Sequence, residues 1–176
     1  GATKLCAEKL MISGNFYAGN QPSRFAVVRY GNVLGSRGSL LHIVKDQRAS
    51  GEITLTHEEM TRFWITLDRG IELVLNSLQI MQGGETFVPK IPSMRVKDVI
   101  VSLAPECRHK VIGIRPGEKL HEVLVTPEEA RRTKEFDDYY VILPEHDWWE
   151  NNNYVHGQSL PENYKYSSDG NPDMLD

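Results

Sequence analysis

The sequence lacks several features that would identify common classes of protein. It has two cysteines, Cys6 and Cys107, so there is no disulfide framework and we expect both thiols to be reduced. No apolar run approaches the roughly 18 residues that a membrane span needs. The N-terminal residues show no apolar core or cleavage pattern of a signal peptide. These absences favour a cytoplasmic protein with no membrane partner.

Charge and ligand spacing exclude further classes. The formal net charge is −4, and the basic residues are scattered rather than gathered in a stripe, so nucleic acid is not an expected partner. The six histidines show no zinc-ligand spacing with the cysteines, and no metal site is predicted. The sequence has neither a phosphate loop ending in Gly-Lys-Ser/Thr nor a Gly-x-Ser-x-Gly nucleophile elbow.

Helical and strand patterns alternate along the chain, which predicts an α/β fold. We predict helices over residues 2–18, 40–49, 66–81, 96–103 and 127–132, and strands over residues 24–30, 53–55, 86–88, 110–114 and 139–143. The first strand is rich in valine, which predicts burial on both faces of a parallel sheet. Residues after Pro144 show no periodicity, and we expect an irregular tail held by aromatic side chains, including Trp148 and Trp149.

A glycine-rich segment, residues 29–38, follows the first predicted strand. Open α/β sheets bind ligands at the carboxyl ends of their strands, and glycine lets the backbone approach a ligand closely. Asn32 offers a donor and an acceptor, and Arg37 could hold a phosphate or stack on a flat ring. The alternative is an ordinary glycine turn between two elements.

Arginines stand out in two further segments. Arg62 lies beside Phe63 and Trp64, just before a predicted helix, where its planar fork could chelate a diphosphate. The alternative is a surface arginine packed on the tryptophan. In residues 114–122, Arg-Pro-Gly predicts a sharp turn that presents Arg115 to a phosphate.

The same turn contains Glu118, whose carboxylate suits the paired hydroxyls of a ribose. His121 follows three residues later. It has no nucleophile or carboxylate partner in view, so we interpret it as structural rather than as a base.

These motifs resemble the inverting UDP-N-acetylglucosamine 4,6-dehydratases, a group of the extended short-chain dehydrogenase/reductase family. The resemblance rests on residues 29–39, 60–68, 87–94, 114–122 and 166–171, and it covers essentially the whole chain. Residues 1–4, Gly-Ala-Thr-Lys, resemble the end of the family's Tyr-x-x-x-Lys signature, whose tyrosine would stand just before Gly1. The resemblance implies an NADP-dependent lyase of polysaccharide, pseudaminic acid and flagellin-glycan synthesis.

The resemblance also implies how the chain is organised. We expect the C-terminal part of an extended short-chain dehydrogenase/reductase, with a Rossmann-type parallel sheet and a smaller substrate-binding α/β region. Residues 1–50 would be the remainder of the dinucleotide-binding domain, residues 51–143 an interleaved UDP-sugar-binding region, and residues 144–176 the tail. The catalytic tyrosine, the Thr-Asp-Lys triad and the glycine-rich dinucleotide loop would lie upstream. We therefore expect this chain alone to be inactive, and the full-length protein to be a homo-oligomer.

The resemblance assigns roles to individual residues. Lys4 would hold the nicotinamide ribose and lower the pKa of the missing tyrosine, because a nearby ammonium favours the phenolate. The cofactor would also lie near Val33, Leu34, Gly35, Ser36 and Arg37. Asn32 would contact the sugar nucleotide, and the uracil would be bordered by Leu40, Leu41, His42, Ile43, Val44 and Thr54. The diphosphate and ribose would be bound by Arg62, Arg115 and Glu118.

The implied reaction is an internal redox cycle on UDP-N-acetylglucosamine or a related UDP-sugar. Hydride leaves C4 for NADP, the resulting ketone acidifies C5, and water leaves from C6. The hydride then returns to C6, and C5 is reprotonated on the opposite face. The cofactor performs the hydride chemistry, and the protein provides orientation and proton transfer.

Two other interpretations remain open. One is a related enzyme, either a retaining UDP-sugar dehydratase or a UDP-sugar 4-epimerase. The other is a non-catalytic module that binds nucleotide sugars, because a fold does not by itself fix a function. The residues that precede Gly1 in the gene would separate these interpretations.

Overall fold

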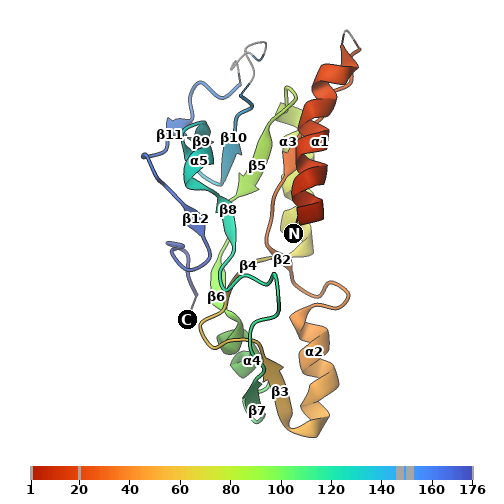
Figure 1. Ribbon diagram of the computed structural model, residues 1–176, viewed down its shortest axis with the longest axis vertical. Helices are drawn as coiled ribbons and strands as arrows, with labels where there is room; N and C mark the ends of the chain where they lie inside the picture. The colour runs from red at the N-terminus through yellow and green to blue at the C-terminus, as the bar shows by residue number, and fades with distance from the viewer. Residues whose placement is uncertain (1, 20, 146–148, 150–152, 176) are drawn as a thin grey trace. The chain divides into compact units, whose positions relative to one another are not determined.

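The computed structural model describes residues 2–19, 21–145, 149 and 153–175 (Figure 1). The chain divides into two compact units, which we describe separately. Unit 1 comprises Gly1–Tyr30, Ile71–Lys90 and Leu124–Lys165, and unit 2 comprises Gly31–Gly70, Ile91–Val123 and Tyr166–Asp176.

Unit 1 is built on a five-stranded mixed sheet. Its strand order is β1 (Val27–Val28), β5 (Thr86–Pro89), β10 (Tyr139–Ile142), β9 (Thr133–Glu135) and β11 (Gln158–Ser159). Only β1 and β5 are parallel, and the other neighbours run antiparallel. Helix α1 (Ala2–Ala18) packs against β1, and the short α5 (Pro127–Ala130) precedes β9. The core is apolar and aromatic, with Phe87, Val141, Leu143 and Tyr154 buried together.

Unit 2 contains two small sheets and two main helices. One sheet has the order β2 (Asn32–Val33), β4 (Thr61–Ile65) and β6 (Ser93–Arg95), and the other pairs β3 (Glu52–Leu55) with β7 (Arg108–Val111) in parallel. Helices α2 (Leu40–Gln47) and α4 (Val96–Leu103) lie beside β3 (Figure 1). Their apolar faces meet in a core of Val44, Ile53, Leu55, Ile100, Ala104 and Cys107.

The remaining elements are short. A 3₁₀ helix, η1 (Arg48–Ser50), follows α2, and α3 (Leu67–Ile80) follows β4. Strands β8 (Val123–Val125) and β12 (Tyr166–Ser167) complete the set. All five predicted helices are present, with ends within three residues of the prediction, and the predicted α/β class is confirmed.

The prediction for residues 24–30 was wrong in extent and burial. Only Val27 and Val28 form a strand, and both are half-buried. The strand lies at the edge of its sheet beside β5 rather than in its centre, where we had expected a strand buried on both faces. The periodicity of α3 was read correctly, but its apolar stripe is exposed: Ile71, Val74, Leu75 and Leu78 are 38–60% accessible.

Several strands escaped prediction because they are short and mixed in polarity. β2, β4, β6, β8 and β9 have two to five residues each, and residues 31–39 were expected to be only a loop. The strand predicted over residues 110–114 is β7, shifted towards the N-terminus because β7 pairs with β3 from Glu52↔Arg108 to Leu55↔Val111. The tail is irregular apart from β11 and β12, and Trp148 lies outside the described residues.

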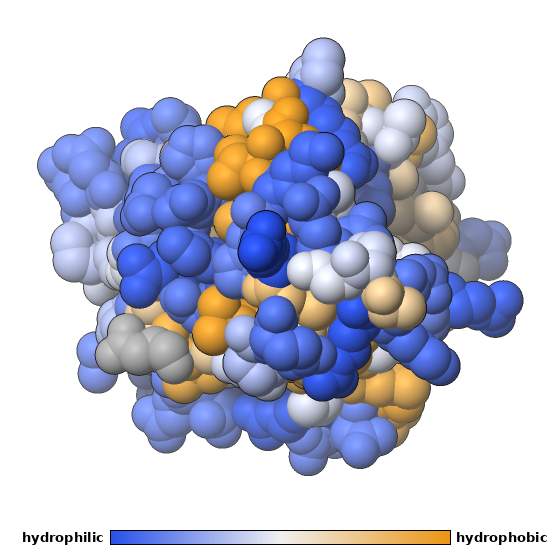
Figure 2. Space-filling view, turned by 90° about the horizontal axis from the view of Figure 1, so that it is seen from below, coloured by the Kyte–Doolittle hydropathy of each residue, from blue (hydrophilic) through white to orange (hydrophobic). Residues whose placement is uncertain are grey.

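The surface seen in Figure 2 is mostly hydrophilic, with separate apolar patches between the polar side chains. Within the described residues, no helix combines the length and the apolar character required to cross a bilayer. Cys6 and Cys107 are free thiols, the first exposed and the second buried.

We predict that Gly31→Ala destabilises unit 2. A β-carbon at this position would lie 2.5 Å from both the Cβ and the carbonyl oxygen of Phe63. Because one of these atoms is backbone, the contact cannot be relieved by a side-chain rotation, and we expect a loss of about 3 kcal/mol. Urea unfolding measures the loss. Gly70→Ala is the control, since open space surrounds that position and alanine favours helix; equal stability of the two variants would contradict the prediction.

Candidate functional site

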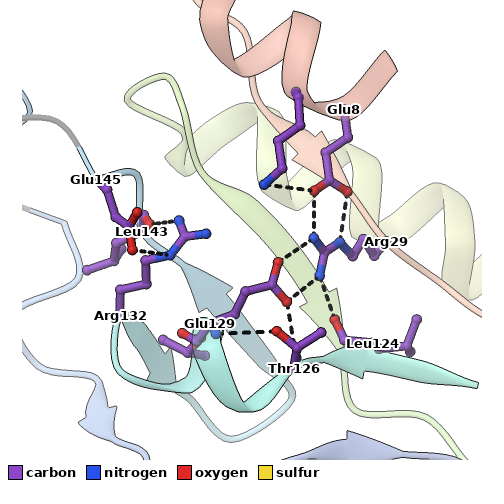
Figure 3. Close-up of polar contacts among 10 residues, drawn as sticks. Glu8, Arg29, Leu124, Thr126, Glu129, Arg132, Leu143 and Glu145 are labelled. Atoms are coloured by element: carbon purple, nitrogen blue, oxygen red, sulfur yellow. Dashed lines mark hydrogen bonds and ion pairs between the residues drawn. The ribbon is translucent and has the colours of Figure 1, made fainter. Parts of the chain in front are cut away.

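Lys4 lies in the first turns of α1, is exposed, and has no ion-pair partner among the described residues. Its ammonium is therefore available to a ligand. Gly1, the first residue of the predicted signature, lies outside the described residues. One turn after Lys4 on the same helix face, Glu8 points into unit 1, where it meets Arg29 (Figure 3).

The Arg29 guanidinium joins three parts of unit 1 (Figure 3). Its Nε and Nη2 donate to the two carboxylate oxygens of Glu8, at 2.8 and 2.5 Å. Nη1 and Nη2 donate to Glu129, at 2.9 and 2.6 Å, and Nη1 also donates to the carbonyl of Leu124 at 2.9 Å. Glu129 in turn closes a capping box with Thr126 at the start of α5. Arg29 thus fixes α1 and α5 around the end of β1.

Burial and charge oppose each other in this cluster. Burial alone would raise the pKa of Glu129, but hydrogen bonding and attraction to Arg29 outweigh it and hold that pKa below the usual value. Burial likewise acts to lower the pKa of Arg29, and the hydrogen bonds and charges of the two carboxylates raise it. Arg29 and Glu129 therefore form a charged pair, and the Arg29 guanidinium is bonded within unit 1 rather than free for a ligand.

In unit 2, the predicted glycine-rich loop leaves the sheet through β2. Asn32 is exposed and lies opposite Trp64 of the parallel strand β4, and the Leu34 amide donates to the Ile65 carbonyl at 2.9 Å. Gly35 has a φ of 75°, a conformation that side chains rarely adopt, and Ser36 closes the turn onto Val33. Residues Leu34 to Arg37 are all exposed to solvent, as a ligand-binding loop requires.

The segment predicted to border the uracil is the first half of α2. His42 and Ile43 are exposed, Leu40 and Leu41 are half-buried, and Val44 is buried in the core of unit 2. His42 Nδ1 lies 3.4 Å from the hydroxyl of Ser39, the N-cap residue. Thr54 is bound to α2 by Gln47, which accepts from the Thr54 amide at 2.8 Å and bonds to its hydroxyl at 3.1 Å.

Arg62 is largely buried, with a side chain 12% exposed. Its Nη1 donates to the carbonyls of Thr61 and Leu120, at 2.7 and 3.0 Å, and its Nη2 donates to the Lys119 carbonyl at 2.9 Å. Two carboxylates, those of Glu118 and Glu122, lie 3.8 and 3.6 Å from its nitrogens. Arg62 is therefore bonded to the residues that directly follow Glu118, the one predicted nucleotide-binding residue among its partners.

Arg115 and Glu118 form a tight turn. The Glu118 amide donates to the Arg115 carbonyl at 3.0 Å, and the Arg115 amide donates to the Glu118 carboxylate at 3.2 Å. Pro116 followed by Gly117, with a φ of 79°, is the pattern of a type II turn. The Arg115 side chain is exposed and has no ion-pair partner among the described residues. The turn therefore presents a guanidinium from a rigid base.

Unit 2 contains every predicted site residue except Lys4. The structure brings Arg62 and Glu118 together, and Asn32 pairs with the same strand that carries Arg62. Sequence analysis missed Glu8, Gln47 and Glu129, which are bound to Arg29 or Thr54. The Thr126-x-x-Glu129 spacing was a readable capping-box signal. Among the described residues, no three His, Cys, Asp or Glu side chains gather in a possible metal site.

We predict that Arg29→Met lowers the stability of the protein by about 3–5 kcal/mol at neutral pH, because two buried carboxylates lose their partner. The folded pKa of Glu129 lies below its unfolded value. The stability that this pair supplies is thus present at neutral pH and is lost as the pH falls through the folded pKa. Urea midpoints should be measured from neutral to acidic pH. The difference between the midpoints of Arg29→Met and of the native protein should shrink once the pH falls below the usual pKa of a glutamate.

Arg48→Met is the matched control, since its ion pair with Glu106 is more than half exposed and we expect little change in the midpoint. An Arg29→Met midpoint that matched this control at neutral pH would contradict the role given to the cluster.

Comparison with known proteins identifies the family and the fold. Residues 1–144 match the model of the family described as polysaccharide biosynthesis protein. The UDP-N-acetylglucosamine 4,6-dehydratase (inverting) of Campylobacter jejuni subsp. jejuni is 45% identical over 98% of this chain and 54% of the relative. The UDP-glucose 4-epimerase of Rickettsia rickettsii is 35% identical over 81% of this chain and 43% of the relative.

One solved structure, that of Pen from Bacillus thuringiensis, superposes with a TM-score of 0.83 at 32% identity, over 97% of this chain and 52% of that one. The chain thus spans about half the length of the relatives that it matches. It belongs to the polysaccharide biosynthesis protein family, and its fold is that of the C-terminal part of an extended short-chain dehydrogenase/reductase.

Proposed function

We propose that this chain is the substrate-binding part of an NADP-dependent UDP-N-acetylglucosamine 4,6-dehydratase that inverts C5. The observation that carries the proposal is the rigid Arg115–Glu118 turn with its exposed guanidinium, in a chain 45% identical over 98% of its length to a dehydratase of that name. Pseudaminic acid and flagellin-glycan synthesis are the pathways that we propose for the product.

In this proposal, unit 2 binds the nucleotide. Arg115 pairs with the diphosphate, because a guanidinium forms charge-assisted hydrogen bonds with phosphate oxygens. Glu118 has one carboxylate oxygen bonded within the turn, and the other, which lies 3.8 Å from Arg62 Nη2, would also accept from a ribose hydroxyl. Asn32 contacts the sugar, and the exposed side chains of α2 border the uracil together with Thr54.

We assign the nicotinamide end of a dinucleotide to two segments, each considered within its own unit. In unit 1, Lys4 offers an ammonium with no ion-pair partner among the described residues, and in unit 2, Val33–Arg37 form a largely exposed loop with a glycine in the left-handed region. A bound nicotinamide would supply a hydride acceptor and donor. Lys4 would hold a ribose hydroxyl and keep a positive charge near the proton-transferring tyrosine of the Tyr-x-x-x-Lys signature. We assign residues 1–50 to the remainder of the dinucleotide-binding domain.

The exposed apolar faces support the proposal that another polypeptide segment completes the enzyme. Leu75 and Leu78 of α3 are 54% and 60% accessible, and Leu10 of α1 is 71% accessible. Apolar residues at helical spacing are expected to face a packed surface. The relatives have nearly as many residues again as this chain, which is enough for a dinucleotide-binding half.

The full-length polypeptide containing this chain should convert UDP-N-acetylglucosamine to a 4-keto-6-deoxy sugar nucleotide in the presence of NADP, with one solvent deuteron incorporated at inverted C5. Mass spectrometry and NMR of the product measure both. We expect no turnover by the 176-residue chain alone. Arg115→Ala should raise KM by about 10- to 100-fold, the loss expected for charged hydrogen bonds.

The same assay distinguishes the other candidates. A UDP-sugar 4-epimerase, which the similarity to the Rickettsia rickettsii relative favours, would give an epimer that retains its oxygen at C6. A retaining dehydratase would give the same mass with uninverted C5. Binding of UDP-N-acetylglucosamine with no turnover by the full-length protein would indicate a non-catalytic module.

A further inference from the structure

We propose that Arg62, Thr61 and Ser168 are positioning residues that hold the nucleotide-binding turn, and that Arg62 does not itself contact the diphosphate. This inference rests on the proposed function, since it concerns how the Arg115–Glu118 turn is held for its ligand. All the residues involved belong to unit 2.

The segment that needs support is irregular. No helix or strand is present between the end of β7 at Val111 and the start of β8 at Val123. Residues 112–117 are exposed, and the described bonds of the turn are those between Arg115 and Glu118. A turn with so few internal bonds keeps one position only if the residues that follow it are fixed.

Arg62 fixes those residues through backbone oxygens. It donates to the carbonyls of Lys119 and Leu120, while the Thr61 amide also donates to Leu120 at 3.2 Å. A guanidinium has five donors in a rigid fork. Three of these donors bond to carbonyls. The carboxylates of Glu118 and Glu122 lie 3.8 and 3.6 Å from Nη2 and Nε, the nitrogens that carry the other two donors, so these carboxylates are ion-pair partners rather than hydrogen-bond acceptors. A phosphate would have to compete with both carboxylates for the remaining donors of Arg62.

The hydroxyl of Thr61, next to Arg62, holds the following residue. It lies 2.8 Å from His121 Nδ1 and 2.7 Å from the hydroxyl of Ser168. Thr61 is 3% exposed, and Ser168 is fully buried. The buried Thr61 hydroxyl therefore bonds to both the Ser168 hydroxyl and the His121 imidazole, which agrees with the structural role predicted for His121.

Ser168 reaches the same segment from near the end of the chain. Its amide donates to the Glu122 carbonyl at 2.9 Å, and its hydroxyl accepts from the Glu122 amide at 2.9 Å. The neighbouring Tyr166 is fixed in turn, because its hydroxyl bonds to both the amide and the carbonyl of Ile91. Every residue from Lys119 to Glu122 is thus bonded to Thr61, Arg62 or Ser168.

The test is a double-mutant cycle in the full-length polypeptide, with the Kd for UDP measured calorimetrically in the presence of NADP. Arg115→Ala is the reference for loss of a direct contact. We expect Arg62→Ala to weaken UDP binding by about tenfold while kcat stays within about threefold, and Arg62→Lys to recover part of the affinity. The Arg62→Ala/Arg115→Ala double variant should bind UDP about as tightly as the Arg115→Ala variant. Once the Arg115 guanidinium is absent, the loss of the residue that positions it has little further effect.

Arg48→Ala is the matched control in the same unit, an exposed arginine paired with Glu106, and it should leave the Kd for UDP unchanged. If Arg62→Ala fails to fold, Ser168→Ala takes its place in the cycle, since it leaves both arginines intact. We expect it to weaken UDP binding by about threefold or more, again without adding to Arg115→Ala.

Three outcomes would overturn the inference. Additive effects of Arg62→Ala and Arg115→Ala would mean that Arg62 contacts the ligand directly. A normal Kd for both Arg62→Ala and Ser168→Ala, with Arg115→Ala still impaired, would remove the positioning role and leave the proposed function standing. A normal Kd for Arg115→Ala would overturn the assignment of the turn itself, and with it both proposals.

Discussion

The carbonyl oxygens of an irregular segment need hydrogen-bond donors from outside that segment. In each unit a largely buried arginine supplies such donors. Arg29 donates to two carboxylates and to the Leu124 carbonyl, and so holds α1 and α5 to the end of β1. Arg62 donates to the carbonyl of Thr61 in β4 and to that of Lys119 in the loop, and so joins the strand to the loop. The planar fork of arginine suits this task, because its donors point in fixed directions and its charge is retained on burial.

Two predicted ligand-binding groups, Lys4 and Arg115, differ in exposure from the charged groups that hold the nearby backbone. Lys4 and Arg115 are exposed and have no ion-pair partner in the described part of the chain. Glu8, four residues after Lys4, and Arg62, which contacts the turn that contains Arg115, are both bonded and mostly buried. A charge that must meet a ligand stays in solvent, whereas a charge that orients the backbone can be desolvated once it is fully paired.

Sequence periodicity predicted the helices because it is a local property. The stripe of α3 follows from Ile71, Val74, Leu75 and Leu78 alone, although its exposure does not. Strands such as β4 and β9 were missed because their few residues carry arginine, lysine and glutamate, and pairing across the sheet decides their conformation. The motif around Arg115 was found since Pro-Gly fixes a turn locally. The bonds of Arg62 could not be predicted from the sequence, because its hydrogen-bond acceptors are backbone carbonyls, which any residue can supply.

The bond between Ser168 and Glu122 joins the last part of the chain to a segment made 46 residues earlier. During synthesis, the loop around Arg115 therefore emerges from the ribosome well before the hydroxyl that completes its support. A nascent chain at that stage would contain Arg62, Arg115 and the two glutamates of the loop, Glu118 and Glu122, yet would lack the bonds from Ser168. Loss of the segment that begins at Tyr166 would remove the bonds between Ser168 and Glu122, so the support proposed for the loop depends on this short stretch.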